Sequence, residues 1–332
     1  MDLYLFKPDD FNRLYNCNLY DTEIFPREER RLRVIGLLCL PPGILSVVLY
    51  FVCIYAMLQK QLIKLPTYKL MLFMAFFHLY GCILGGFFIP YLFYEAPVYC
   101  ESPDFIYLAG AYCTASWIGG TITSTILSFN RCCEMYDHTL AHWLFADYRV
   151  FIWMAFPLTL FLYCLFYNRP LLFSGIGMSW YFNPHHKYID DLDGVYVNKM
   201  HTLNNTVTVA TQFVLSFTFM VLYFGWVKSH KTRMSRTDKL MCLQVFLIGL
   251  LELFAGTTFL LQQHYEFNLA MSLFASISWF GSQACAPYIY LTFNRTVRNI
   301  VLRRFLPCCG RKVNFNVSEI PSTFHAKRKN PQ

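Results

Sequence analysis

The sequence predicts an all-α membrane protein, a bundle of seven transmembrane helices followed by a short amphipathic helix. Of its 332 residues, 56% are hydrophobic and only 14% are charged, whereas soluble proteins carry about 25% charged residues. The apolar residues are gathered into seven long runs, each close to the roughly 20 residues that a helix needs to cross the hydrocarbon. Barrel strands would be about half that length and would alternate in polarity, so helices are expected.

The seven hydrophobic runs define the predicted helices in chain order. Glu252, in the sixth run, is the one Asp, Glu, Lys or Arg that any of them contains. The runs are 34–58, 70–94, 105–130, 150–168, 203–227, 240–263 and 267–294. We expect four parts: an extracellular N-terminal segment (1–33), the bundle (34–294), an amphipathic helix on the membrane surface (295–306) and a disordered cytoplasmic tail (307–332).

Positive charge predicts which side of the membrane each connecting segment faces. The segments on the N-terminal side hold 9 Lys and Arg against 14 Asp and Glu, and those on the other side hold 19 against 5. Cytoplasmic segments are enriched in Lys and Arg, so we expect a multi-pass plasma-membrane protein with its N-terminus outside. One local signal disagrees, because four arginines precede the first run. They are Arg27, Arg30, Arg31 and Arg33.

The cysteines predict one disulfide. Of the thirteen, only Cys17 and Cys100 lie in segments expected to face the oxidising exterior. Thiols in that compartment are usually paired. We therefore predict a Cys17–Cys100 bond that ties the N-terminal segment to the top of the third helix, with two unpaired thiols as the alternative.

The predicted inner face carries two features of interest. The third run ends in Asn130-Arg131, where an arginine stem can extend to the interface. The seventh run contains Pro287, which frees a backbone carbonyl and favours a bend, and Tyr290 follows one turn later. Each feature alone is common in membrane helices, but their combination in this order is more specific.

The segment after the seventh run has the pattern of a basic amphipathic helix. Apolar residues recur at helical spacing on one side, with arginines elsewhere around the helix, as in helices that lie on a membrane surface. The apolar residues are Val297, Ile300, Val301 and Phe305. Cys308 and Cys309 follow Pro307 at the expected interface, where palmitoylation is a candidate modification.

Several motifs together resemble the nematode chemoreceptors called serpentine receptor class T, a family of G-protein-coupled receptors. They are Tyr15-Asn16-Cys17, Asn130-Arg131, Trp180-Tyr181-Phe182-Asn183-Pro184, Asn204-Asn205, and the stretch from Pro287-Tyr288-Ile289-Tyr290 to Arg298. The resemblance covers nearly the whole chain. It implies a seven-helix receptor of chemosensory neurons, with the sensory cilium as a candidate location, that binds a small molecule and activates a heterotrimeric G protein.

The resemblance also implies roles for particular residues. Arg131 would match the arginine that faces the G protein, while Pro287 and Tyr290 would match residues that rearrange in the seventh helix. Several positions depart from the pattern: Asn130 stands where an acidic residue usually precedes the arginine, His78 stands where the second helix often carries an acid, and Ala286 replaces an asparagine. The sixth run also lacks the usual tryptophan and proline.

Two polar residues in the predicted spans are of particular interest. A carboxylate in lipid is unfavourable, so Glu252 should face the bundle interior. His78 lies at a similar depth by residue count, about ten residues from the inner edge in each helix at 1.5 Å per residue. A His78–Glu252 contact is therefore one hypothesis, and two separately hydrogen-bonded side chains are the other.

Helical periodicity places a candidate ligand pocket in the outer half. Stepping outward from Arg131 along one face of the third helix reaches Trp117 and then Cys113. If Arg131 points inward, these two residues border an outer cavity suited to a small apolar or weakly polar ligand. Simple helix packing by Trp117 is the alternative. We take Cys113 and Trp117, together with His78 and Glu252, as the candidate pocket residues.

Other classes of function have less support in the sequence. A ligand-gated channel or transporter is the main alternative, although no internal repeat or filter motif is visible. No catalytic motif predicts an enzyme, and His138 and His142 lack the further ligands that a metal site needs. We expect a small-molecule ligand, a heterotrimeric G protein and the lipid bilayer as partners, and no cofactor, metal or nucleic acid.

Overall fold

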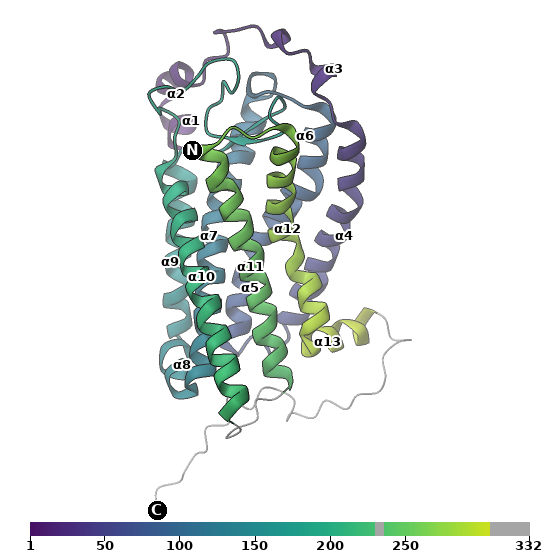
Figure 1. Ribbon diagram of the computed structural model, residues 1–332, viewed down its shortest axis with the longest axis vertical. Coiled ribbons are helices and arrows are strands. Elements are labelled where there is room, and N and C mark those ends of the chain that lie inside the picture. The colour runs from purple at the N-terminus through teal and green to yellow at the C-terminus, as the bar shows by residue number, and fades with distance from the viewer. Residues whose placement is uncertain (230–235, 306–332) are drawn as a thin grey trace, which may run out of the picture.

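The computed structural model describes residues 1–229 and 236–305 as an elongated bundle of long helices. Figure 1 shows these helices side by side, with the short helices α1 (Asp2–Phe6), α2 (Pro8–Leu14) and α3 (Arg27–Arg30) at one end and α13 (Arg295–Phe305) at the other. We call the first the outer end and the second the inner end, after the predicted orientation. The tail 307–332, with Cys308 and Cys309, lies outside the described residues.

The long helices confirm the seven-helix fold that the hydrophobic runs predict, and most of their ends fall within a few residues of the expected ones. They are α4 (Arg33–Met57), α5 (Pro66–Ile83) continued by η2 (Leu84–Phe88) and α6 (Ile89–Glu95), α7 (Pro103–Tyr136), α9 (Arg149–Tyr167), α10 (Lys199–Ser229), α11 (Arg236–His264) and α12 (Leu269–Phe293). The shorter elements are η1 (Thr22–Ile24), η3 (Tyr99–Glu101), α8 (His138–Phe145) and the hairpin of β1 (Leu172–Ser174) with β2 (Ser179–Tyr181).

Five of the described helices are long and apolar enough by themselves to cross a membrane. They are Arg33–Met57, Pro66–Glu95, Arg149–Tyr167, Lys199–Gly225 and Lys239–His264. The helices α7 and α12 fall outside this set. Because α7 packs against α5, α9, α10 and α11, its polar side chains bond inside the bundle. The hydroxyls of Thr121 and Thr123, for example, donate to the carbonyls of Trp117 and Gly119.

The second helix changes its winding at η2, a single π-helical segment between α5 and α6. A π turn accommodates one extra residue and is a common device in functional helices. The backbone of α4 approaches η2 closely here, since a Cβ added to Gly43 would lie 2.3 Å from the Cα of Gly86. Only glycine at these two positions allows the helices this separation.

Two large hydrophobic clusters fill the bundle, one in each half. The outer cluster includes Phe77, Phe93, Tyr107, Trp117 and Trp180. The inner cluster includes Tyr50, Met71, Leu127, Phe145 and Tyr290, together with Val297 and Val301 from α13. Ile300 also packs against this cluster, so the amphipathic helix docks by three of its four predicted apolar residues. The ring of the fourth, Phe305, meets that of Tyr55 at a centroid distance of 5.6 Å.

Candidate functional site

A cavity opens at the outer end between the hairpin, α10 and α11, and encloses about 230 Å³. Aromatic and polar side chains share its wall, which consists of Leu171, Trp180, Tyr181, Phe182, Asn183, His186, Asp191, Val197, His201, Phe259, Gln262 and Gln263. The sequence did not predict that these residues form a pocket. Some of them belong to the Trp180–Pro184 motif, which contributes to the family resemblance but does not indicate a cavity.

A recess of about 10 Å³, enough for roughly one water molecule, lies beside this cavity and shares four of its residues. Leu171, Trp180, His201 and Phe259 line both spaces. The remaining walls of the recess are Cys113, Thr114, Trp117 and Trp279. Cys113 and Trp117, the two residues that helical periodicity placed beside an outer cavity, thus line the recess. Together we call the two spaces the outer cavity.

Side chains from α10 fix the position of Trp117. Its indole Nε1–H donates to the side-chain oxygen of Asn205 at 2.7 Å. The neighbouring Asn204 donates from Nδ2 to the hydroxyl of Thr121 at 3.1 Å. The Asn204-Asn205 pair therefore joins α10 to α7 just below the recess, and both asparagines are buried.

His78 and Glu252 meet in the centre of the bundle. Nε2 of His78, from α5, lies 3.3 Å from Oε1 of Glu252, from α11, and both side chains are fully buried. The two atoms are close enough for an ion pair but are not aligned as a hydrogen bond. Neither residue lines the outer cavity. The four residues proposed for one pocket thus fall into two separate groups.

The predicted inner-face residues occupy the last turns of α7. The guanidinium of Arg131 donates to Glu134 one turn later. Thr67, at the start of α5, lies within hydrogen-bonding distance of both Asn130 (3.1 Å) and Glu134 (3.3 Å). Glu134 thus supplies the carboxylate that pairs with Arg131.

Pro287 and Tyr290 lie apart from this group, on α12. The helix continues through Pro287, whose carbonyl oxygen faces the thiol of Cys53 at 3.8 Å. Tyr290 is fully buried in the inner cluster, and its hydroxyl has no hydrogen-bond partner among the described residues. A buried hydroxyl without a partner is unfavourable in the present arrangement and would gain by moving to one.

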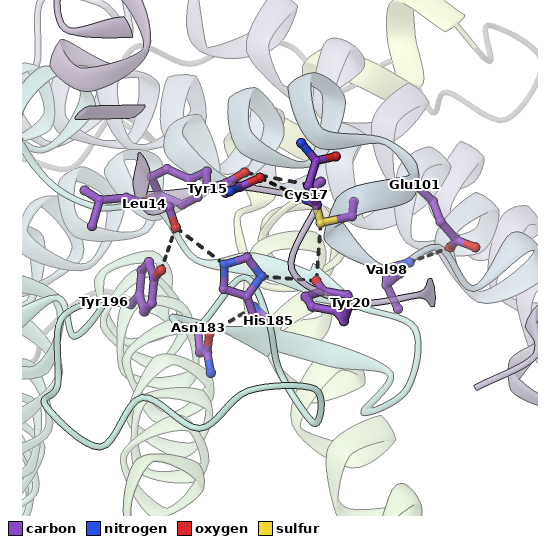
Figure 2. The surroundings of a disulfide bond; sticks show 12 residues. Leu14, Tyr15, Cys17, Tyr20, Val98, Glu101, Asn183, His185 and Tyr196 are labelled. Carbon is purple, nitrogen blue, oxygen red and sulfur yellow. Dashed lines mark hydrogen bonds between the residues drawn. A yellow bond between two sulfur atoms is a disulfide. The ribbon is translucent and has the colours of Figure 1, made fainter. Parts of the chain in front are cut away.

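The N-terminal segment packs against the loop after β2, and the predicted disulfide ties it to η3. Cys17 and Cys100 are bonded, with their Cα atoms 5.3 Å apart, which confirms that prediction. Figure 2 shows the ring of His185, from the loop after β2, between two parts of the N-terminal segment. Its Nδ1 is 3.1 Å from the hydroxyl of Tyr20, and its Nε2 is 3.4 Å from the carbonyl oxygen of Leu14.

The histidines of this loop are neutral at physiological pH. Burial lowers the pKa of His185. For His186, burial and then the charge of Lys187 lower the pKa to about 4, while its ring stacks on Tyr181 at a centroid distance of 3.6 Å. A neutral His185 satisfies both of its contacts when Nε2–H donates to Leu14 and Nδ1 accepts from Tyr20.

The arginines that disagreed with the predicted orientation are neutralised by acidic residues. Arg27 and Arg30 each bind Glu101 at 3.1 Å. Arg31 binds Glu95 and Glu28, and Arg33 binds Glu28 at 2.7 Å. Glu28 is a sequence neighbour of these arginines, but Glu95 ends α6 and Glu101 ends η3, so their part in the pairing could not be read from the local sequence.

One known protein family matches nearly the whole chain. The model of the family described as "Serpentine type 7TM GPCR chemoreceptor Srt" matches residues 2–314. No curated protein matches the chain. The matched range contains the outer cavity, the central His78–Glu252 pair and the Arg131 group.

Proposed function

The chain belongs to the Srt family of serpentine seven-transmembrane chemoreceptors, and from this premise we propose that it binds a small ligand in the outer cavity and activates a heterotrimeric G protein at the inner end. The family is one of receptors rather than enzymes, and its membership favours a receptor over a channel or transporter. With its apolar helices, the chain is a multi-pass membrane protein.

The main support for the proposal is that one helix, α7, contributes residues both to the outer cavity and to the proposed G-protein contact. Cys113 and Trp117 line the recess and Arg131 lies near the inner end, all on α7. At 1.5 Å per residue, Trp117 and Arg131 are separated by about 21 Å of continuous helix. A ligand that moves Trp117 therefore acts directly on the element that bears the proposed G-protein contact.

The inner end would respond by releasing Arg131. In the present arrangement, the guanidinium is occupied by Glu134, which Thr67 also contacts. A ligand that binds an alternative conformation more tightly shifts the population towards it. We propose that in this alternative conformation Arg131 leaves Glu134 for the G protein, while Pro287 and Tyr290 allow α12 to rearrange.

The proposed orientation puts these groups on the correct sides of the membrane. The charge distribution favours an extracellular N-terminus and a cytoplasmic C-terminus at the plasma membrane, with the sensory cilium as the proposed location. Lipids attached to Cys308 and Cys309, beyond the described residues, would hold α13 at the inner surface. Tags at both ends, probed with antibodies in intact and permeabilised cells, test the orientation.

Nucleotide exchange on purified G proteins tests the function. The full chain in lipid nanodiscs is mixed with a panel of heterotrimeric G proteins, with and without a library of small lipophilic compounds. We expect at least one G protein to exchange nucleotide faster, and Arg131→Gln to abolish the increase. Arg149→Gln, on α9, is the matched control and should retain it. Equal exchange by Arg131→Gln and the unchanged protein would refute the proposed role of Arg131.

A further inference from the structure

We infer that the outer cavity selects a small uncharged ligand that carries a hydrogen-bond acceptor, such as a ketone, ester or lactone. The inference rests on the proposed function only in taking the cavity as the ligand site. Two observations support it. Two buried N–H groups at the cavity lack acceptors, and the cavity lining contains one carboxylate but no lysine or arginine.

The first N–H group belongs to Trp180 of β2. Only 4% of this residue is exposed, and its Nε1 has no hydrogen-bond partner among the described residues. Trp180 lines both the recess and the larger space, so it stands where the two meet. Most buried donors in folded proteins are paired, and an unpaired one at a cavity wall favours a ligand that supplies the acceptor.

The second N–H group belongs to Gln262 near the end of α11. Its Nε2 is buried and makes no aligned hydrogen bond in the described part of the chain, and the hydroxyl of Tyr181 lies close to this side chain. Its Oε1 is already used, because it accepts from the hydroxyl of Ser179 at 3.4 Å. Gln262 lines the larger space together with Trp180, so this wall of the cavity offers donors to a ligand.

The charges around the cavity disfavour an ionised ligand. Asp191 is the carboxylate in the lining, and its two oxygens already accept from the backbone N–H groups of Val195 (2.7 Å) and Tyr196 (2.9 Å). Each oxygen is thus already partly satisfied by the backbone, which weakens the attraction of Asp191 for an amine. The lining contains no lysine or arginine, and nearby Lys187 pairs with Glu266 at 3.3 Å. A carboxylate ligand would thus be desolvated without a counter-charge.

The arrangement of polar and apolar walls orients the ligand. Seven residues besides Trp180 line the recess, and all but Thr114 and His201 are apolar or carry a thiol. The larger space carries three amide side chains, and the imidazole of His201 borders both spaces. Because the recess holds only about one water molecule, the ligand occupies the larger space, with its acceptor beside Trp180 and its hydrocarbon part against Leu171 and Phe259, which line both spaces.

Binding of matched pairs of compounds tests this inference directly. The purified full chain in lipid nanodiscs is titrated with cyclohexanone, cycloheptanone and acetophenone, and with methylenecyclohexane, methylenecycloheptane and α-methylstyrene, which replace the carbonyl oxygen by a methylene group. Cyclohexylamine and cyclohexanecarboxylate are the charged probes. Affinity is followed by tryptophan fluorescence and by the shift in the heat-unfolding midpoint.

We expect at least one ketone to bind about tenfold more tightly than its methylene counterpart, and the charged probes to bind more weakly than the ketone. Trp180→Phe keeps a ring and deletes the N–H, so it should reduce the ketone preference about three- to tenfold while leaving the methylene compound unchanged. Gln262→Met is a second variant of similar length. Trp143→Phe, at an exposed position of α8, is the matched control and should change nothing.

Four results would overturn the inference: equal binding of ketones and methylene compounds, tighter binding of the amine or the acid, a ketone preference that survives both variants, or failure of every ketone to bind. The nucleotide-exchange experiment is independent. Ketone binding without exchange would retain this inference and refute the proposed signalling, and exchange driven by an amine would do the reverse.

Discussion

The charged groups at the outer end share their partners, whereas those inside the bundle have one ionic partner each among the described residues. At the outer end, Glu101 accepts from Arg27, Arg30 and the backbone N–H of Val98. In the centre, Glu252 faces His78, and both are fully buried.

The difference follows from the cost of removing a charge from water. At the outer end, the side chain of Glu101 is buried but keeps Arg30 when Arg27 is lost, and the side chain of Arg27 itself is 37% exposed. An ion pair with one exposed partner and a second partner in reserve contributes little individually. In the bundle, loss of one partner leaves a buried charge without compensation. Single substitutions in the outer network should therefore cost less stability than single substitutions at the central pair.

The largest effect is expected at the centre. His78→Leu or Glu252→Leu alone should lower the free energy of unfolding by about 3–5 kcal/mol, because each leaves the other group buried without its partner. The double substitution should cost less than the sum of the two. Denaturant unfolding of all four proteins measures this coupling. Strictly additive effects would show that the two side chains act separately.

Loss of the disulfide should come next. Cys17→Ser opens a bond between cysteines 83 residues apart and should lower the stability by about 2–4 kcal/mol, since the unfolded chain is no longer cross-linked. Heat unfolding with and without reductant measures the effect. Reductant should destabilise the unchanged protein and a Cys39→Ser control, but it should have no further effect on Cys17→Ser.

A smaller effect is expected at the inner end of α7. Glu134→Gln removes the charge that holds Arg131 and should weaken this contact by about 1–3 kcal/mol. If Arg131 is the G-protein contact, ligand-independent nucleotide exchange should rise. Glu28→Gln, at the exposed outer network, is the matched control and should leave exchange unchanged. Lower exchange in Glu134→Gln would indicate that Glu134 itself takes part in coupling.

Acid should loosen the outer end. The pKa of His186 is lowered to about 4 in the folded protein from an ordinary value of about 6.5. Stability contributed by the neutral ring is therefore present above about pH 6.5 and is lost as the pH falls towards 4. The unfolding midpoint should fall by a few degrees more in the unchanged protein than in His186→Phe, with Lys187 and Glu266 as the neighbouring charges. Equal falls would exclude His186 as the cause.

The smallest effect is expected in the outer network. Arg27→Ala should cost less than about 1 kcal/mol, because Glu101 keeps Arg30 and the N–H of Val98. Heat unfolding at low and high salt measures it, and salt should reduce the difference between the two proteins. A loss comparable with that of Glu252→Leu would remove the contrast between shared and single partners.

The sequence predicts those features that depend on nearby residues. Hydrophobic length located the seven helices, spacing predicted α13, and the choice of compartment identified the Cys17–Cys100 bond. Helical period alone brought Cys113 and Trp117 to the same face of α7, where both line the recess.

Features built from distant segments could not be predicted in this way. The rotation of α5 and α11 about their axes determines whether His78 reaches Glu252, and a residue count gives only their depth. The wall formed by Trp180 and Gln262 depends on how a loop folds over the bundle. Likewise, the arginines before α4 look unfavourable for export until Glu95 and Glu101 are placed beside them.

The π turn at Leu84–Phe88 changes the rotation of the rest of the second span about the helix axis. One extra residue turns everything beyond it by about 100° relative to a regular helix with 3.6 residues per turn. Deleting a single residue there would rotate α6 as a unit, carrying Pro90 away from Gly36, whose added Cβ would lie 2.6 Å from the Pro90 carbonyl oxygen. The number of residues between His78 and Glu95 thus determines which side of α6 faces the bundle, as much as the identities of those residues do.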